Sequence, residues 1–243
     1  IFMYALLESS TFDIIIFRLL DTAIGIVIAL IANYTLFPGW GLLDIKKAVT
    51  QTISKNYKYL FNIKDLFKRN KEVLTIYKIS RKEAFIATSN LNAAFERMTQ
   101  DPKSKQIEFE LIYEIVTLNN TILSTIASLG RFIQKHPEAQ ISEEFKEIIS
   151  YILKLFSSTL SLLKNGTIDN KTINHTITEP LNNLLALYKE YSKKRDTEIK
   201  QGKKEIDKEM LFNLQHTYMM YNQLLWLKNL SENKYILLSK YIN

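Results

Sequence analysis

The chain has 243 residues and no cysteine, which excludes disulfide bonds, thiolate metal sites and cysteine nucleophiles. Its six glycines and four prolines are few and favour long uninterrupted helices over a β-sandwich or a doubly wound sheet. The net charge is +7, but residues 1–45 hold one basic and four acidic side chains, so residues 46–243 carry a net charge near +10. A region with this positive charge is suited to binding nucleic acid, anionic lipid or an acidic partner, and charge alone does not choose among them.

The first residues, "IFMYALL", are apolar and have neither a basic leader nor a small-residue cleavage site, so we do not expect a signal peptide. We expect them to be the tail of an incoming membrane helix from a longer polypeptide. The segment "ESSTFD" (8–13) would then form a short outer turn before the next helix.

A helix over 13–37 is expected to cross the membrane. No charged side chain occurs in residues 22–43, and the core of a bilayer, about 30 Å thick, needs about 20 such residues in a helix. Pro38 and Gly39 should end this helix, because proline cannot donate to the helix ladder and glycine accepts the turn. Trp40 would then lie at the boundary between lipid and water.

Arg18 and Asp21 stand three residues apart near the outer end of this helix, where they can pair on one face. Two interpretations stay open. The pair either snorkels to the interface and neutralises itself, or it faces the interior of a helix bundle and meets an anionic solute. They are the candidate residues for a solute path.

The charges that flank the helix give it an orientation. Four lysines and no acid occur in residues 46–63, whereas Glu8 and Asp13 precede the helix without a basic residue. Under the positive-inside rule the basic end is cytoplasmic. The sequence therefore predicts a membrane region over 1–40 and a cytoplasmic helical domain over 41–243.

Apolar residues recur at helical spacing throughout this second region, and no segment alternates with period two. The fourth segment is the clearest, with Leu111, Ile115, Leu118, Ile122, Ile126, Leu129 and Ile133 on one stripe. Helices are expected over 41–68, 71–100, 105–135, 142–165, 178 to about 200, and 207–241. The predicted fold class is thus all-α, a membrane-span-like helix followed by a bundle of about six helices. The charged run 193–209 is expected to be a solvated face or an exposed turn, with a contact to anionic lipid or protein as the alternative.

The residues that catalysis or metal binding would need are missing. His136, His175 and His216 lie far apart, and none has a partner at the spacing of a metal motif. We therefore expect no enzyme, no metal and no cofactor. The aromatic residues that alternate with lysines over 55–82 are expected to fill a helical core, although such a pattern also occurs in nucleic-acid stacking surfaces.

Three stretches together resemble the fusaric acid resistance protein-like (FUSC-type) inner membrane proteins. These are "RLLDTAIGIVIALIANYTLFP" (18–38), "RKEAFIATSNLNAAFERMTQDPKSK" (81–105) and "YEIVTLNNTILSTIASLGRFI" (113–133). They cover under a third of the chain, and their order and spacing are more specific than any one of them. Residues 140–243 match no familiar pattern.

The resemblance implies a multi-span membrane half followed by a cytoplasmic helical domain, in a homodimer that exports aromatic or anionic organic solutes. The lipid bilayer and the upstream membrane helices of the same polypeptide would be its partners. Arg81, Glu83, Glu96 and Arg97 do not fit a helical core, so they are candidates for a contact with a neighbouring helix or a second chain, with simple solvation as the alternative.

Two other classes of function compete with this interpretation. The chain could be a soluble all-α interaction domain whose first helix is buried by a partner. A nucleic-acid-binding helical module is weaker, because only net charge supports it.

Overall fold

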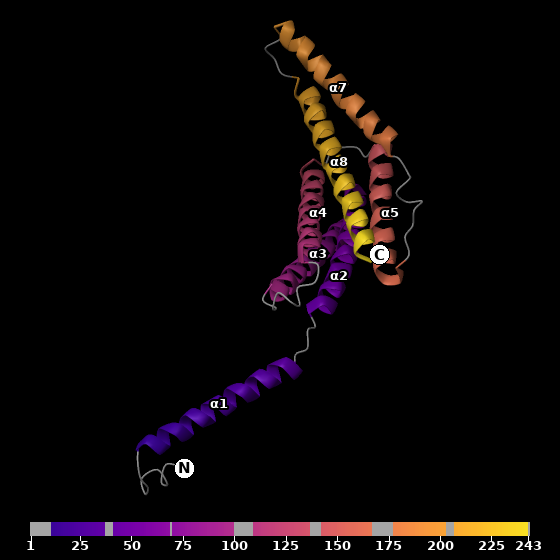
Figure 1. Ribbon diagram of the computed structural model, residues 1–243. Coiled ribbons are helices and arrows are strands. Elements are labelled where there is room, and N and C mark those ends of the chain that lie inside the picture. Colours follow the sequence, from indigo (N-terminus) through magenta and orange to yellow (C-terminus); the bar gives the residue numbers. More distant parts are fainter. Residues whose placement is uncertain are drawn as a thin grey trace. The chain divides into compact units, whose positions relative to one another are not determined.

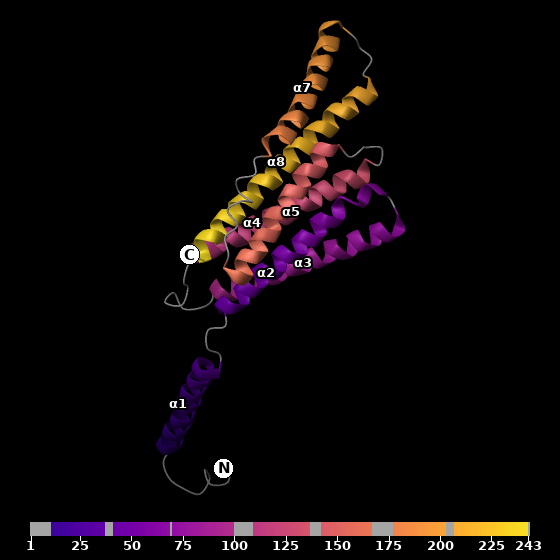
Figure 2. The same cartoon turned by 90° about the vertical axis from the view of Figure 1, so that its right-hand side faces the viewer.

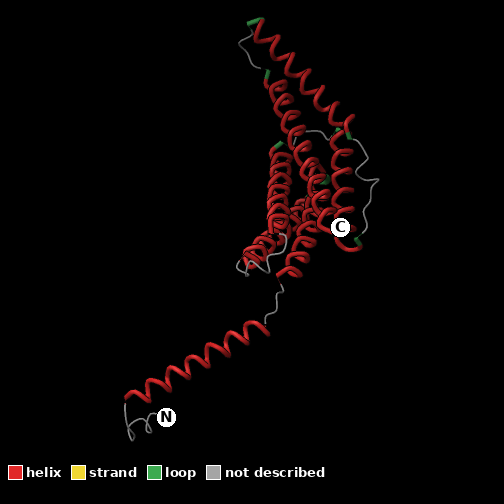
Figure 3. Tube along the Cα trace, in the orientation of Figure 1, coloured by secondary structure: helices red, strands yellow, loops and turns green. Residues whose placement is uncertain are grey.

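Figure 1 shows the computed structural model, in which residues 11–36, 41–68, 70–99, 109–136, 142–166, 177–202 and 207–242 are described. In this part of the chain the regular elements are helices, and Figure 3 draws no strand. They are α1 (Thr11–Leu36), α2 (Gly41–Ile63), the short 3₁₀-helix η2 (Leu66–Lys68), α3 (Lys71–Thr99), α4 (Phe109–Lys135), α5 (Glu143–Asn165), α7 (Thr178–Lys200) and α8 (Lys208–Ile242). The predicted all-α fold class is confirmed.

The ends of α5 follow the signals in the sequence. The Ser142 hydroxyl oxygen accepts a hydrogen bond from the backbone N–H of Phe145 at 3.2 Å, which satisfies one of the free donors of the first turn. At the other end Gly166 has φ 68°, and its N–H donates to the Leu162 carbonyl at 2.9 Å. This left-handed conformation strains any residue with a Cβ, so glycine is required there.

Several predicted chain breaks lie outside the described residues. They are Pro38, Gly39 and Trp40 after the first helix, the corner at Asp101-Pro102, Pro137, and the connector that follows Gly166 and contains His175.

Contacts divide the chain into two units, 1–42 and 43–243. In the first, α1 has a 20-residue stretch, Asp13–Ala32, with mean hydropathy 2.5, and none of this stretch is buried. By length and composition it could cross a membrane, since 20 helical residues rise about 30 Å.

In the second unit, α8 contacts three other helices. It packs against α4, α5 and α7, while α3 packs against α4 and α5 packs against α7 (Figure 1). After a 90° turn, Figure 2 shows α2 and α3 side by side along most of their length. The bundle thus has two groups, α2–α3–α4 and α5–α7–α8, which meet where α4 packs against α8 and where Phe67 of η2 packs against Phe145 of α5, with ring centres 5.7 Å apart.

The core follows the predicted stripes. Five of the seven aliphatic residues predicted on the α4 stripe are at most 5% exposed, and the other two, Leu111 and Leu118, are half-buried. On α2 the predicted residues Ile45, Val49, Ile53, Leu60 and Ile63 are likewise buried. The prediction for the aromatic residues of 55–82 is confirmed for Tyr59 and Tyr77, which are buried, whereas Phe61 is 38% exposed.

Three helices meet at a pair of tyrosines. The hydroxyl oxygens of Tyr59 on α2 and Tyr77 on α3 lie 3.2 Å apart, and the two rings are 5.5 Å apart. Gly130 on α4 faces them, and a Cβ on this glycine would lie 2.5 Å from the Tyr77 hydroxyl. The absence of a side chain at Gly130 therefore lets α4 approach the tyrosine pair.

We predict that Gly130→Ala destabilises the bundle. The added methyl would displace the buried Tyr77 ring, at a cost of about 1–3 kcal/mol, which exceeds the roughly 1 kcal/mol that alanine gains in helix propensity. The lowered free energy of unfolding is measured by urea titration of the full chain with circular dichroism.

Tyr77→Phe supplies the control, because it removes the atom nearest to the new methyl group. The Gly130→Ala change should cost less in a Tyr77→Phe background than in the wild type. Equal costs in both backgrounds would contradict the proposed clash.

Candidate functional site

Helix α1 carries the first pair of candidate residues. Arg18 and Asp21 are both exposed, and no ion pair joins their side chains in the described part of α1. The only polar contact at this point is local: the Thr22 hydroxyl donates to the Arg18 carbonyl at 2.8 Å. Both charged side chains therefore remain available to water, lipid headgroups or a neighbouring helix, and the choice between the two interpretations stays open.

The second set of candidate residues lies along α3, and the structure brings only one of them to a neighbouring helix. Glu83 forms an ion pair with Lys55 of α2 at 2.9 Å, and this hydrogen bond lowers the pKa of the Glu83 carboxyl. Arg81 is exposed and lies 5.6 Å from the ring of Phe85 on its own helix. Its charge also acts on Tyr59, whose pKa burial raises well above the usual range.

Glu96 and Arg97, by contrast, are exposed near the C-terminal end of α3. No ion pair to either side chain occurs within the described ranges. Their predicted role at an interface with a second chain stays a prediction.

A groove of about 550 Å³ runs between α3 and α4. Its lining is mainly small and polar: Thr88, Ser89, Asn92, Asn120, Ser124, Ala127 and Ser128, with Leu123, Phe85 and Arg131 completing it. Asn92 and Asn120 exchange two side-chain hydrogen bonds across it, at 3.2 and 3.0 Å. Every lining residue falls within 81–105 or 113–133, the two family-like stretches, so those stretches form one surface.

The chemistry of this groove is that of binding rather than catalysis. Its hydroxyl and amide groups donate and accept hydrogen bonds, and Arg131 supplies the only charge in the lining. No carboxylate or histidine lies in it, so a general acid or base is missing from the groove. Groups of three or more residues able to hold a metal ion are absent from the described residues.

A buried lysine escaped the sequence analysis. Lys234 on α8 is 0% exposed, and among the described residues its ammonium has no hydrogen-bond or ion-pair partner. The nitrogen lies 3.8 Å above the centre of the Phe156 ring of α5. A cation–π contact is worth about 0.5–2 kcal/mol, which is less than the cost of burying a charge. Burial therefore lowers the pKa of Lys234 to about 7.

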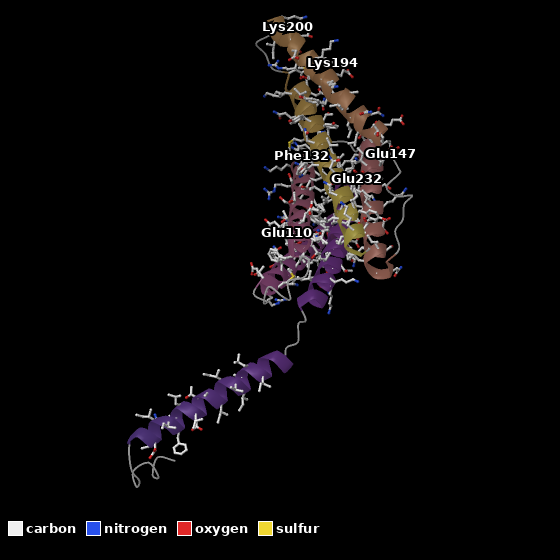
Figure 4. The ribbon with its side chains drawn as sticks, viewed as in Figure 1. Glu110, Phe132, Glu147, Lys194, Lys200 and Glu232 are labelled. Atoms are coloured by element: carbon white, nitrogen blue, oxygen red, sulfur yellow. The ribbon has the colours of Figure 1, made fainter. Side chains whose placement is uncertain are left out.

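The signal for this lysine is present in the sequence. Leu227, Leu230, Lys234 and Leu238 follow one another at steps of three and four, so Lys234 occupies a place on the apolar stripe of α8. Two residues away, Glu232 on the same helix accepts hydrogen bonds from Tyr151 of α5 at 2.7 Å and from Lys228 at 2.9 Å (Figure 4 labels Glu232).

Two of the three histidines belong to one aromatic cluster. His136 and His216 both pack against Phe132 of α4 and Phe212 of α8, with ring centres 4.6 to 5.6 Å apart. This aromatic cluster joins the C-terminal end of α4 to α8. Eighty residues separate the two histidines, so sequence spacing could not reveal that they share these aromatic neighbours.

Comparison with known proteins identifies two relatives. The chain is 23% identical over 141 residues to the inner membrane protein YccS of Escherichia coli (strain K12), a match that covers 58% of this chain and 20% of YccS. It is 27% identical over 128 residues to an uncharacterized protein of Haemophilus influenzae, covering 53% of this chain and 18% of that protein. The chain therefore spans about a fifth of the length of each relative that it matches.

These matches support a broad grouping with the FUSC-like inner membrane proteins, in line with the resemblance seen in the sequence. No protein-family model and no solved structure matches the chain.

We predict that Lys234→Met stabilises the bundle at pH 7. Methionine fills a similar volume without a charge, and removing a buried charge from a core is worth about 1–4 kcal/mol. The folded state holds Lys234 at a pKa of about 7 against 10.5 unfolded, so the unfolded chain binds more protons between these values. Stability of the wild type should thus rise from pH 7 to 9, and the variant should show a flatter profile.

Lys240→Met is the matched control, since Lys240 is exposed on the same helix. It should leave the urea midpoint and its pH dependence unchanged. The measurements stop at pH 9 because burial also raises the pKa of Tyr59 and Tyr151, which opposes the effect at higher pH. A Lys234→Met variant less stable than the wild type at pH 7 would show that the charged form is well accommodated.

Proposed function

We propose that this chain is the last membrane helix and the cytoplasmic helical domain of a FUSC-type inner membrane protein that exports organic solutes, aromatic or anionic in character. The observation that carries the proposal is α1: a 20-residue apolar stretch that buries none of its surface. A soluble protein would hide such a stretch in its core. The similarity to the inner membrane protein YccS supports the same cellular location.

The orientation follows from charge. Lys46, Lys47, Lys55 and Lys58 come shortly after α1, and positively charged residues stay on the cytoplasmic side. The bundle of α2 to α8 would then lie in the cytoplasm. Because the chain covers only about a fifth of its relatives, upstream membrane helices would complete the translocation path.

The bundle itself would serve assembly or regulation. It offers no catalytic group in the α3–α4 groove, and exposed apolar residues such as Ile79, Phe85 and Ile86 lie on α3 beside the charged candidate residues. Formation of a homodimer through α3 remains part of the proposal. The competing function, a soluble interaction domain, would require a partner to cover α1.

Membrane extraction tests the location. The chain expressed in bacteria should remain in the membrane pellet after washes with high salt and alkaline carbonate. Ile26→Lys combined with Leu30→Lys places two charges near the middle of α1, at a cost of about 2.5–3.5 kcal/mol each for insertion. This double variant should move to the soluble fraction.

The matched control is Ile79→Lys with Ile86→Lys, two exposed isoleucines of α3. It adds the same charge outside the membrane helix and should leave the chain in the pellet. Release of the wild-type chain by carbonate would contradict the membrane assignment and favour the soluble interaction domain.

Transport is tested at Arg18 in the full-length protein. If Arg18 lines an anion path, Arg18→Gln should abolish tolerance of the cells to aromatic carboxylic acids, with protein abundance unchanged, because the charge that attracts the solute is lost. Lys189→Gln, at an exposed position of α7, is the control and should transport normally. If Arg18→Gln still transports, Arg18 does not line the path and only extends its side chain to the membrane interface. If the variant protein is lost from the cells, the charge of Arg18 is needed for the structure.

A further inference from the structure

A second pocket lies between α2 and α5, and all the charged residues in its lining are basic. It has a volume of about 450 Å³ and is lined by Lys46, Lys47, Thr50, Gln51, Ser54, Lys55, Leu160 and Lys164. We call it the lysine cleft. Four of its eight lining residues are lysines and none is acidic. Its volume is that of a site for a small ligand, within the range of about 300–1,000 Å³.

Most of this positive charge is uncompensated. Lys55 pairs with Glu83 at 2.9 Å, whereas no carboxylate among the described residues pairs with Lys46, Lys47 or Lys164. The surroundings add to the charge. Residues 45–63 of α2 and 148–166 of α5 contain six lysines and no acid, so the potential around the cleft is positive and attracts anions.

The remaining lining suits an oxygen-rich headgroup. The side chains of Gln51 and Ser54 add hydrogen-bond donors, while Thr50 donates to the Lys46 carbonyl at 2.8 Å. Leu160 provides an apolar wall. Lysine ammonium groups bind phosphate oxygens as strong point charges, and hydroxyl and amide donors complete the coordination of a phosphodiester.

We propose that the lysine cleft binds the phosphate headgroup of an anionic lipid. The assignment to lipid rests on the proposed function, because α1 must lie in the membrane to bring the cleft to it. Only residues 37–40 separate α1 from α2, and Lys46 and Lys47 follow within two turns of the start of α2. A basic cluster tethered this closely to a membrane helix meets headgroups at high effective concentration.

Binding is measured on the full 243-residue chain in a zwitterionic detergent, by calorimetric titration with dihexanoyl phosphatidylglycerol below its micelle concentration. We expect saturable binding that weakens with salt, and no saturable binding of dihexanoyl phosphatidylcholine. The triple variant Lys46→Gln, Lys47→Gln, Lys164→Gln should bind at least tenfold more weakly, since each lysine near an anionic headgroup contributes about 1 kcal/mol.

The control carries the same loss of charge on α7: Lys189→Gln, Lys193→Gln, Lys200→Gln, all exposed (Figure 4 labels Lys200). It should bind as the wild type does. An equal loss in both triple variants would overturn the proposal, because net charge alone would then explain binding. Equal affinity for inorganic phosphate would overturn the assignment to lipid and leave a site for a free anion.

Failure of the proposed function gives a different result. The short-chain lipid is soluble, so the titration does not depend on insertion of α1. A chain that carbonate releases from membranes yet binds phosphatidylglycerol selectively would refute the membrane assignment and uphold headgroup recognition. A chain retained in membranes that shows no preference for phosphatidylglycerol would refute the cleft alone.

Discussion

The contact between α4 and α8 is the constraint on which the helical domain depends. It links α2–α3–α4 to α5–α7–α8, and two further features lie between these groups: Phe67 of η2 packs against Phe145 of α5, with ring centres 5.7 Å apart, and α2 and α5 together line the lysine cleft. α4 carries a stripe of buried Leu and Ile, α8 carries a stripe of buried Leu that Lys234 interrupts, and the aromatic cluster around His136 and His216 extends the contact to the end of α4. Packing of long helices, rather than turns or disulfides, therefore determines the fold.

This dependence makes the burial of Lys234 informative. A charged group in the core of α8 costs several kcal/mol unless it is neutral or paired, and in the described residues its one close partner is the face of Phe156. The energetic cost of burying Lys234 falls on α8, the helix whose contact with α4 links α2–α3–α4 to α5–α7–α8. The stability of the domain is consequently coupled to proton concentration near neutrality.

The sequence predicted the elements better than the contacts between them. Helix ends at Ser142 and Gly166 were predictable because capping depends on neighbours within a few residues. The stripe of α4 was predictable because one periodicity decides which side is buried. The ion pair between Lys55 and Glu83, the tyrosine pair and the α3–α4 groove were not, since each needs the relative rotation of two helices. The burial of Lys234 was not predictable from its residue type, because an unpaired lysine is almost never fully buried.

The amide pair of Asn92 and Asn120 has a consequence for how the two family-like stretches stay matched. Each amide both donates to and accepts from the other, so the pair is satisfied at only one longitudinal position of α3 against α4. A slip of one helical turn would break both of these hydrogen bonds. The pair thus fixes the register of α3 against α4. It would let the two helices move together as one rigid body while other contacts in the bundle change.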